Sequence, residues 1–239
     1  MRDEVDRLVS PFLAEADTVL GGRYSAVLYG SAVRGDFVPG RSDVNLMLIL
    51  EDLSPPVLRS LGRAFSGWRK SEYEPPLLIS RSEWSRATDV FPIEIADMRT
   101  GYTVLRGDDP MAGLALERSD LRRALEREFR GKLLRLRQGY AASAGDAQAL
   151  GALAGKSAGT VLVLLRALLT LLGRPVPADP VELAGASADA IGAGREHLIH
   201  VFSHRGERNW RCSPAEFEHY LEAVAQVARF LDQLHLGDQ

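Results

Sequence analysis

The sequence predicts an α+β fold in which a mixed β-sheet with flanking helices is followed by an α-helical bundle. Up to residue 112, short apolar runs typical of strands alternate with segments that have helical spacing. After that point helical periodicity dominates. The 239 residues are enough to bury a substantial core. We therefore expect two domains, residues 1–112 and residues 113–239.

The first half contains every predicted strand. Continuous apolar runs predict strands at residues 24–29, 44–50, 77–80 and 91–98, with a short edge strand at 104–105. Apolar residues at helical spacing predict a helix over residues 3–20, bent at Pro11. A second helix is predicted over residues 55–72, because its opening Pro-Pro pair suits a first turn. Ser82 is expected to open a short third helix.

The second half predicts helices only. Their expected ranges are residues 116–141, 146–173, 179–191, 193–205 and 213–235. Asp179 is a start signal for the third of these helices, and Ser213 with Glu216 forms a capping box at the start of the last. Gly173, followed by Pro175, predicts the end of the second.

Composition limits the classes of function. The formal net charge of −3 gives no reason to expect that the protein wraps nucleic acid. The single cysteine, Cys212, cannot form an internal disulfide, which favours a reducing compartment. The most apolar run, residues 161–172, contains Arg166 and is shorter than the roughly 20 residues that a bilayer requires. The acidic opening of the chain is unlike a signal peptide. We expect a cytoplasmic protein that does not bind a membrane.

The most informative stretch joins the first two predicted strands. Gly30-Ser31 ends the first apolar run, a loop follows, and Ser42-Asp43-Val44-Asn45 leads into the second. This pattern resembles the nucleotidyltransferase superfamily of DNA polymerase β, in which Gly-Ser is followed by Asp-x-Asp on a strand and by a third carboxylate on a later strand. The resemblance covers residues 20–107. The helices after it are similar to those of the kanamycin and streptomycin/spectinomycin adenylyltransferases, in which a helical domain closes the cleft.

The resemblance implies phosphate-binding roles for several residues. Gly30 allows a sharp turn and the approach of a phosphate without a Cβ in the way. Ser31 can donate its hydroxyl and its backbone N–H to phosphate oxygens, and Ser42 is expected to assist. Arg34 follows one turn later, where its charge can neutralise a triphosphate. Lys156, in the second half, has two interpretations: a contact to the triphosphate, as in adenylyltransferases of this shape, or a solvent-facing helix lysine.

The same resemblance implies a Mg²⁺ site. Asp43 and Asn45 project from one face of the second strand, because strand side chains alternate. Glu94, in the run FPIEIADM, is expected to supply the third carboxylate. Asp97 is the alternative, because the two acids would lie on opposite faces of a strand. The predicted metal ligands and catalytic residues are therefore Asp43, Asn45 and Glu94.

Asn45 departs from the Asp-x-Asp pattern and weakens the implied metal site. Its amide oxygen can contact Mg²⁺ but does not supply the charge of a carboxylate. The loss of one such electrostatic contact commonly costs on the order of 3 kcal/mol, or roughly a hundredfold in rate. The favoured function is the Mg²⁺-dependent transfer of a nucleoside monophosphate to a hydroxyl of a small molecule or protein. AMP donated by ATP is the favoured case. The alternative is an inactive relative that binds a nucleotide or a partner protein.

The remaining polar residues have plainer interpretations. Asp36 and Arg41 are expected to be solvated. The candidates for a general base are Asp108, Asp109, Glu126 and Glu128. The basic residues Arg130, Lys132, Arg135 and Arg137 either form a rim to the cleft or are the wet side of an amphipathic helix. The spacing of His197, His200 and His204 suits Zn²⁺ or Ni²⁺, but a partly buried polar helix face is favoured.

Overall fold

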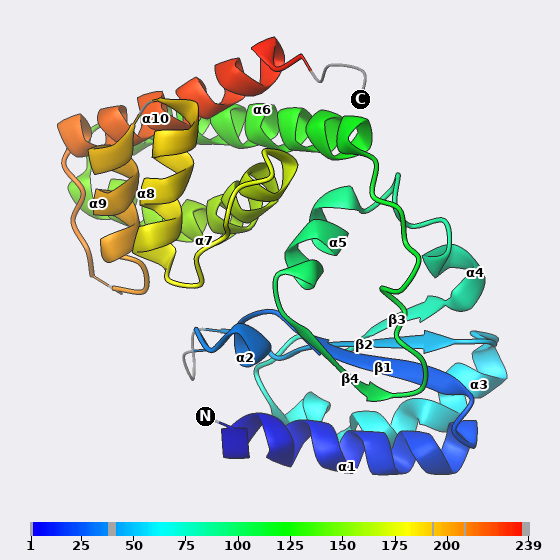
Figure 1. Ribbon diagram of the computed structural model, residues 1–239. Helices are drawn as coiled ribbons and strands as arrows, with labels where there is room; N and C mark the ends of the chain where they lie inside the picture. The colour runs from blue at the N-terminus through cyan, green and yellow to red at the C-terminus, as the bar shows by residue number, and fades with distance from the viewer. Residues whose placement is uncertain (1, 38–41, 193, 208, 236–239) are drawn as a thin grey trace. The chain divides into compact units, whose positions relative to one another are not determined.

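The computed structural model describes residues 2–37, 42–192, 194–207 and 209–235 (Figure 1). The chain forms two compact units. The sheet unit contains residues 1–91 and 98–115, and the helical unit contains residues 92–97 and 116–239. This division differs from the expected one after residue 112 chiefly because residues 92–97 belong to the helical unit.

The sheet is mixed. Its strands are β1 (Tyr24–Tyr29), β2 (Asn45–Leu50), β3 (Leu77–Ser80) and β4 (Tyr102–Arg106), in the order β3-β2-β1-β4. β2 and β4 pair antiparallel with β1, whereas β3 pairs parallel with β2. The three predicted strands that correspond to β1, β2 and β3 are confirmed, and the predicted edge strand is confirmed as the longer β4.

One face of the sheet shares a hydrophobic core with helix α1 (Arg2–Leu20). The even-numbered residues of β2 lie in this core together with Phe12 of α1. The Phe12 ring meets the Trp68 indole edge to face, with ring centroids 5.0 Å apart. Because side chains alternate along a strand, the odd-numbered residues of β2, Asn45 among them, point to the other face.

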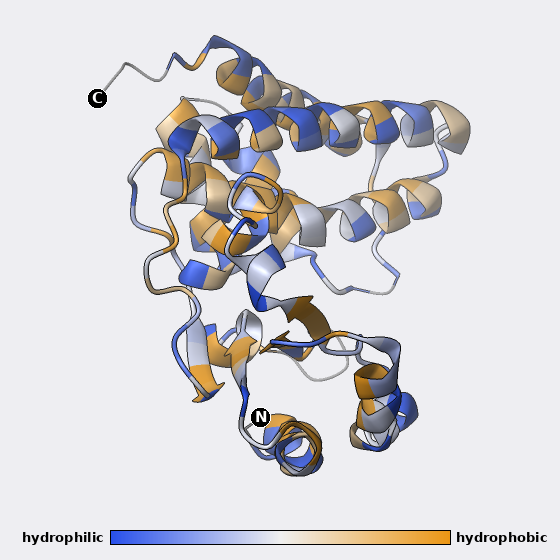
Figure 2. Cartoon of the chain, turned by 90° about the vertical axis from the view of Figure 1, so that its right-hand side faces the viewer, coloured by the Kyte–Doolittle hydropathy of each residue, from blue (hydrophilic) through white to orange (hydrophobic). Residues whose placement is uncertain are grey.

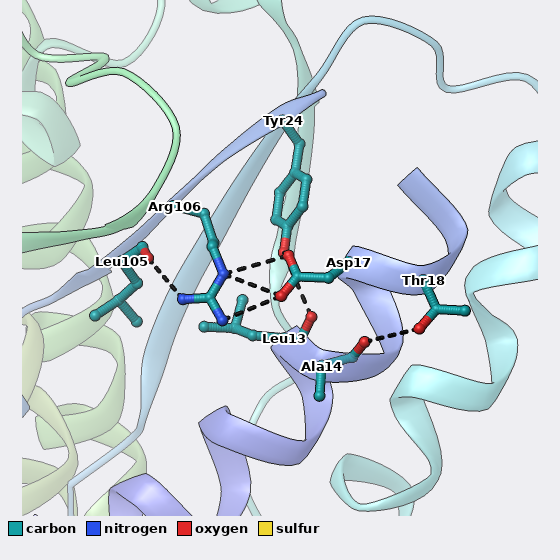
Figure 3. A network of polar contacts seen from close by, with 7 residues as sticks. All are labelled: Leu13, Ala14, Asp17, Thr18, Tyr24, Leu105 and Arg106. Carbon is teal, nitrogen blue, oxygen red and sulfur yellow. Dashed lines mark hydrogen bonds and ion pairs between the residues drawn. The ribbon is translucent and has the colours of Figure 1, made fainter. Parts of the chain in front are cut away.

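A polar network joins α1 to the sheet (Figure 3). The Tyr24 hydroxyl donates to Oδ1 of Asp17 over 2.6 Å, and the Arg106 guanidinium pairs with the same carboxylate at 3.1 Å. Burial and the Asp17 carboxylate raise the pKa of Tyr24. The network therefore ties α1 to β1, the strand that leads into the Gly30 turn, and to β4 beside it.

The segment predicted as one helix over residues 55–72 is helical but broken. It forms α3 (Pro55–Ser60) and two short 3₁₀ turns, η1 (Leu61–Ser66) and η2 (Trp68–Lys70). The next helix is α4 (Arg81–Trp84). Its cap is Ser80, whose hydroxyl accepts the N–H of Glu83 over 3.1 Å, and not Ser82 as predicted. Ser80 is the better cap because Glu83 stands three residues after it and completes a capping box.

The predicted strand over residues 91–98 is wrong, because this segment forms helix α5 (Pro92–Arg99). Ile93 and Ala96 stand three residues apart, and both are buried in the core of the helical unit. A second buried apolar pair of the same helix has the same spacing. Burial of apolar residues at helical spacing therefore outweighs the strand preference of the isoleucines.

The helical unit confirms the prediction for the second half of the chain. Its longer helices are α6 (Arg118–Ser143), α7 (Ala147–Leu171), α8 (Pro180–Ile191), α9 (Arg195–Ser203) and α10 (Pro214–Gln233). Figure 2 shows hydrophilic and hydrophobic bands alternating along α6, as expected for a helix with one buried side. The predicted caps are present, since Asp179 accepts N–H groups at the start of α8 and Ser213 with Glu216 forms the capping box of α10.

Among the described residues, α7 is the helix that is long and apolar enough to cross a membrane. However, 61% of its most apolar window is buried inside the protein. Arg166 in this helix is only 4% exposed, and its apolar neighbours belong to the core of the helical unit. α7 is thus a core helix of the kind predicted for residues 161–172. The cytoplasmic location stays a prediction.

Candidate functional site

The Gly30-Ser31 turn ends β1 in a backbone conformation that only glycine adopts readily. Gly30 has a φ of 79° and a ψ of −150°. Its N–H donates to the carbonyl oxygen of Gly101 over 3.1 Å, and helix α2 (Ser31–Arg34) follows directly. A Cβ added at Gly30 would lie 2.8 Å from Nδ2 of Asn45. The turn therefore needs glycine both for its backbone angles and for the space that Asn45 occupies.

Asn45 lies beside this turn, and Asp43 precedes Asn45 by two residues, ahead of the start of β2. Asn45 begins β2 directly opposite Tyr29, the last residue of β1. Val44 is buried in the core shared with α1, whereas Asn45 is half-buried and Asp43 is exposed. Since the even-numbered residues of β2 lie in that core, strand alternation directs the Asn45 side chain to the other face. Ser42, which precedes them, is half-buried. This end of the sheet therefore carries a glycine turn, one carboxylate and one amide.

A tyrosine and a second acid belong to the surroundings of Asp43. The Tyr73 hydroxyl donates to Oε1 of Glu4 over 2.5 Å. This hydrogen bond, burial, and the charges of Glu4 and Asp43 raise the pKa of Tyr73 to about 12. Tyr73 is therefore a neutral hydrogen-bond donor at neutral pH, within range of the Asp43 charge. No sequence motif indicates this arrangement, because Glu4, Asp43 and Tyr73 are far apart along the chain.

A row of side chains crosses the sheet at the same level as the turn. Asn45, Tyr29 and Tyr102 occupy directly opposed positions on β2, β1 and β4, so their side chains share one face. The Tyr102 hydroxyl donates to Oδ2 of Asp109 over 3.0 Å, and this bond raises the pKa of Tyr102. Asp109 is one of the candidate bases. Neither tyrosine is predictable from the motif, because their alignment depends on strand register.

Arg34 is engaged within the sheet unit. Its Nε lies 3.5 Å from Oδ1 of Asp36, and its Nη1 donates to Oγ1 of Thr100 over 3.3 Å. The Arg34 and Asp36 side chains are 9% and 13% exposed, so the prediction that Asp36 is solvated is wrong. The reason is that Asp36 balances a buried guanidinium. Gly101 leaves room for this side chain, since a Cβ there would lie 2.5 Å from Cγ of Arg34.

The geometry therefore gives Arg34 a supporting role behind the turn. It does not favour the predicted contact between Arg34 and a triphosphate, because Asp36 already matches the charge. Arg41, predicted to be solvated, lies outside the described residues.

The described strands that flank β1 and β2 supply no third carboxylate. β3 has the sequence LLIS and β4 the sequence YTVLR. Glu94 lies on helix α5 in the helical unit, so the strand geometry that favoured it does not exist. Glu94 and Asp97, three residues apart, share one side of this helix and do not lie on opposite faces as predicted. Asp97 pairs with the buried Arg166, with Nη1 3.4 Å from Oδ1.

The residues fit one magnesium ion better than two. Within the described residues, no group of three or more His, Cys, Asp or Glu side chains is placed to hold a metal ion. A site for two ions, which needs bridging carboxylates, is therefore not formed by these side chains alone. Mg²⁺ is often held by one or two carboxylates together with substrate phosphates. Asp43 and the amide oxygen of Asn45 fit that smaller requirement.

Other predicted residues belong to the helical unit. Lys156 is exposed on α7. Glu126 pairs with two arginines of α6, Arg122 at 3.1 Å and Arg130 at 3.2 Å, so this candidate base is neutralised by its neighbours. Glu128 lies 3.7 Å from the guanidinium of Arg127.

The three histidines do not converge on a metal site. His197 stacks on His219, with ring centroids 4.4 Å apart. His200 places Nε2 3.2 Å from Oε1 of Glu216. His204 stacks on an indole ring just past the end of α9. All three are half-buried, so the favoured expectation of a partly buried polar face is confirmed.

Comparison with known proteins supports the fold. No protein-family profile and no curated protein sequence matches the chain. The structure is similar to the crystal structure of spectinomycin adenyltransferase AAD(9) from Enterococcus faecialis with ATP and spectinomycin, with a TM-score of 0.59 at 13% sequence identity. The match covers 95% of this chain and 99% of that one, so it includes both the sheet and the helices. The predicted α+β fold with a helical second part is therefore confirmed, and it is a fold that an adenyltransferase also has.

Proposed function

We propose that the protein binds a nucleoside triphosphate at the Gly30-Ser31 turn and transfers its nucleoside monophosphate to a hydroxyl of a small molecule or protein. ATP is the favoured nucleotide. The observation that carries this proposal is the close approach of Gly30 to Asn45 at one end of β1 and β2. It occurs on a fold shared with an adenyltransferase that was solved with ATP. A glycine held in a conformation closed to other residues is a frequent mark of a ligand-binding turn.

In this proposal the turn holds the phosphates. Gly30 allows the sharp turn with Asn45 packed against it, and the Ser31 hydroxyl and N–H after the turn donate to the phosphate oxygens. Ser42, next to Asp43, adds a further hydroxyl. Asp43 and Asn45 would hold one Mg²⁺ that enters with the nucleotide and makes the α-phosphorus more electrophilic.

The reaction exchanges one bond to phosphorus for another. The acceptor oxygen bonds to the α-phosphorus, the bond to the oxygen that bridges to the β-phosphate breaks, and pyrophosphate leaves. The hydroxyl proton goes to a base, and of the two candidates in the sheet unit, Asp108 and Asp109, we favour Asp109 because Tyr102 bonds to its carboxylate. The proposal gives Arg34 no contact with the triphosphate, because Asp36 neutralises its charge. Glu94 is left out because it does not lie on a strand.

A second candidate function is nucleotide binding without transfer. It is favoured by Asn45 in place of a carboxylate and by the lack of an acid on β3 and β4. With Asp43 as the one carboxylate of the Asp-x-Asn motif, a bound nucleotide would be held but its α-phosphorus less activated.

Two measurements on the full chain separate these functions. Calorimetric titration with ATP, with and without Mg²⁺, reports binding, and ATP labelled at the α-phosphate reports transfer to a panel of hydroxyl compounds. Gly30→Ala should abolish ATP binding through backbone strain and the contact with Asn45. Gly22→Ala is the matched control, because Gly22 also has a positive φ, 73°, but a Cβ there meets nothing within 4 Å.

The outcomes are distinct. Binding that requires Mg²⁺, with transfer of label, supports the transferase. Binding that is indifferent to Mg²⁺, without transfer to any acceptor, supports the second candidate. If the unaltered protein does not bind ATP, or if Gly22→Ala is as harmful as Gly30→Ala, both proposals are wrong.

A further inference from the structure

A pocket on the helical unit is lined by three cations from two neighbouring helices. Its volume is about 280 Å³. α6 contributes Lys132 and Arg135, and α7 contributes Lys156. Residues 132, 135 and 136 of α6, and residues 153, 156, 157 and 160 of α7, recur every three or four positions, so each set forms one helix face. The two faces meet around the pocket.

The polarity of this pocket is set by its basic side chains. Its lining contains no acidic residue: the other members are Leu136, Leu153, Ser157 and Thr160. Ser157 lies at the buried back of the pocket, where its hydroxyl is 2.7 Å from that of Tyr220. The Thr160 hydroxyl is exposed. A ligand in this pocket would therefore meet positive charge at its sides and hydroxyl and apolar groups elsewhere.

The three cations of the pocket differ from four of the arginines of α6. Four arginines on that helix pair with carboxylates, namely Arg122, Arg123, Arg127 and Arg130. No ion pair found among the described side chains includes Lys132, Arg135 or Lys156. The Arg135 guanidinium folds back over Gly131, where an added Cβ would lie 3.6 Å from Nη1.

The electrostatics of Lys132 fit an anion site. Lys132 is half-buried. Burial and then the positive charge of Arg135 lower its pKa, Lys156 lowers it further, and Glu128 only partly opposes them. Repulsion among three like charges around one pocket is relieved when an anion enters.

We propose that Lys132, Arg135 and Lys156 form a binding site for the phosphate group of a small ligand. Phosphate offers several acceptor oxygens and more than one negative charge, which suits two ammonium groups and one guanidinium. The phosphate has two possible sources, the nucleotide of the proposed reaction or a separate phosphorylated ligand. The proposal does not depend on the proposed function, because all of its residues lie in the helical unit.

The test is calorimetric titration of the full chain with inorganic pyrophosphate at low ionic strength. The unaltered protein should show saturable binding. Lys132→Gln and Lys156→Gln should each weaken it about tenfold or more, since each removes one charge-assisted hydrogen bond. Arg137→Gln is the matched control, because Arg137 is an exposed cation on the same helix that does not line the pocket. Thermal melts followed by circular dichroism establish that the variants are folded.

Two results would overturn the proposal: no saturable binding by the unaltered protein, or equal weakening by Arg137→Gln. Loss of pyrophosphate binding in Gly30→Ala, with unchanged binding in Lys132→Gln and Lys156→Gln, would also overturn it, because the anion would then occupy the turn and not the pocket. The same variants identify the source. If Lys156→Gln weakens ATP binding as much as pyrophosphate binding, the phosphate belongs to the nucleotide. If ATP binding is unchanged, the site takes a separate phosphorylated ligand. Failure here while ATP still binds leaves the proposed function intact.

Discussion

Replacing Asn45 by Asp tests whether the amide at this position limits the proposed transfer. The two side chains have the same shape, so the space beside Gly30, where a Cβ would lie 2.8 Å from Nδ2, accommodates either one. The substitution therefore changes charge and leaves packing alone. It creates a second carboxylate two residues after Asp43.

The repulsion between the two carboxylates can be worked out from this spacing. In an extended chain the two carboxylates stand about 6.6 Å apart, or two rises of a strand. At that distance two unit charges repel by about 0.6 kcal/mol in a water-like dielectric, which is appropriate because Asp43 is exposed. Without metal, Asn45→Asp should therefore lower the melting temperature by about 2 °C. Mg²⁺ should restore this loss, and the added charge should raise turnover by roughly a hundredfold, or on the order of 3 kcal/mol.

The assay combines thermal melts over a range of Mg²⁺ concentrations with transfer of label from α-labelled ATP. Asn45→Ala is the control, because it removes the amide without adding charge. The reasoning is refuted if Asn45→Asp melts at the same temperature with and without Mg²⁺ and transfers no faster. If transfer is present in the unaltered protein and falls in Asn45→Asp, the amide is tuned for its task and the weakened-site interpretation is wrong.

Three further predictions concern other parts of the chain. Gly151→Ala should lower the free energy of unfolding, measured by urea denaturation, by about 1–3 kcal/mol, because the new Cβ would lie 1.9 Å from a carbonyl oxygen of the loop before α10. Gly155→Ala is the control: a Cβ there meets nothing within 4 Å, so this variant should raise the free energy of unfolding by about 1 kcal/mol. Glu94→Gln should leave Mg²⁺-dependent ATP binding unchanged whereas Asp43→Asn abolishes it, as measured by calorimetry; equal loss would make a helix the source of the third acid. Backbone N–H groups in the first turn of α7 lower the pKa of Asp146. Its carboxylate therefore stabilises the helix at pH values above its ordinary pKa, and this stabilisation is lost as the pH falls through the lowered pKa. The melting temperature of Asp146→Ala should thus lie below that of the unaltered protein at neutral pH and approach it in acid.

Local signals predicted most of the elements. The caps at Asp179 and Ser213 and the apolar run of β2 act within a few residues, and the structure has those elements as expected. The strand prediction for FPIEIADM was wrong because its period is ambiguous: its isoleucines favour a strand, whereas Ile93 and Ala96 are buried by partners in a distant part of the chain. The same error affects the predicted metal ligands, because the assignment of Glu94 depended on its position in that strand.

The candidate site was predictable only as far as its motif. Gly30 and Asn45 are fixed in relation to one another by two adjacent strands, and Asp43 stands two residues before Asn45, so a short stretch of sequence defines all three. The surroundings depend on register and on long-range contacts. Tyr102 reaches the row through the pairing of β4 with β1, and the pairing of Arg34 with Asp36 depends on the room left by Gly101. No periodicity in the sequence encodes such contacts.

The conformation of Gly30 bears differently on the two candidate functions. A φ of 79° with a ψ of −150° is strongly disfavoured for residues other than glycine. Several contacts hold this conformation: the hydrogen bond from the Gly30 N–H to Gly101, the packing of Asn45, and Arg34 behind the turn. Strain kept in place by several neighbours is typical of turns that meet a ligand. It supports phosphate binding in both candidates, because binding needs only the turn and the Ser31 donors that follow it. Transfer needs charge as well, and that depends on the residue at position 45. Binding without transfer in the unaltered protein, together with transfer in Asn45→Asp, would therefore place the whole difference between the two functions in one amide.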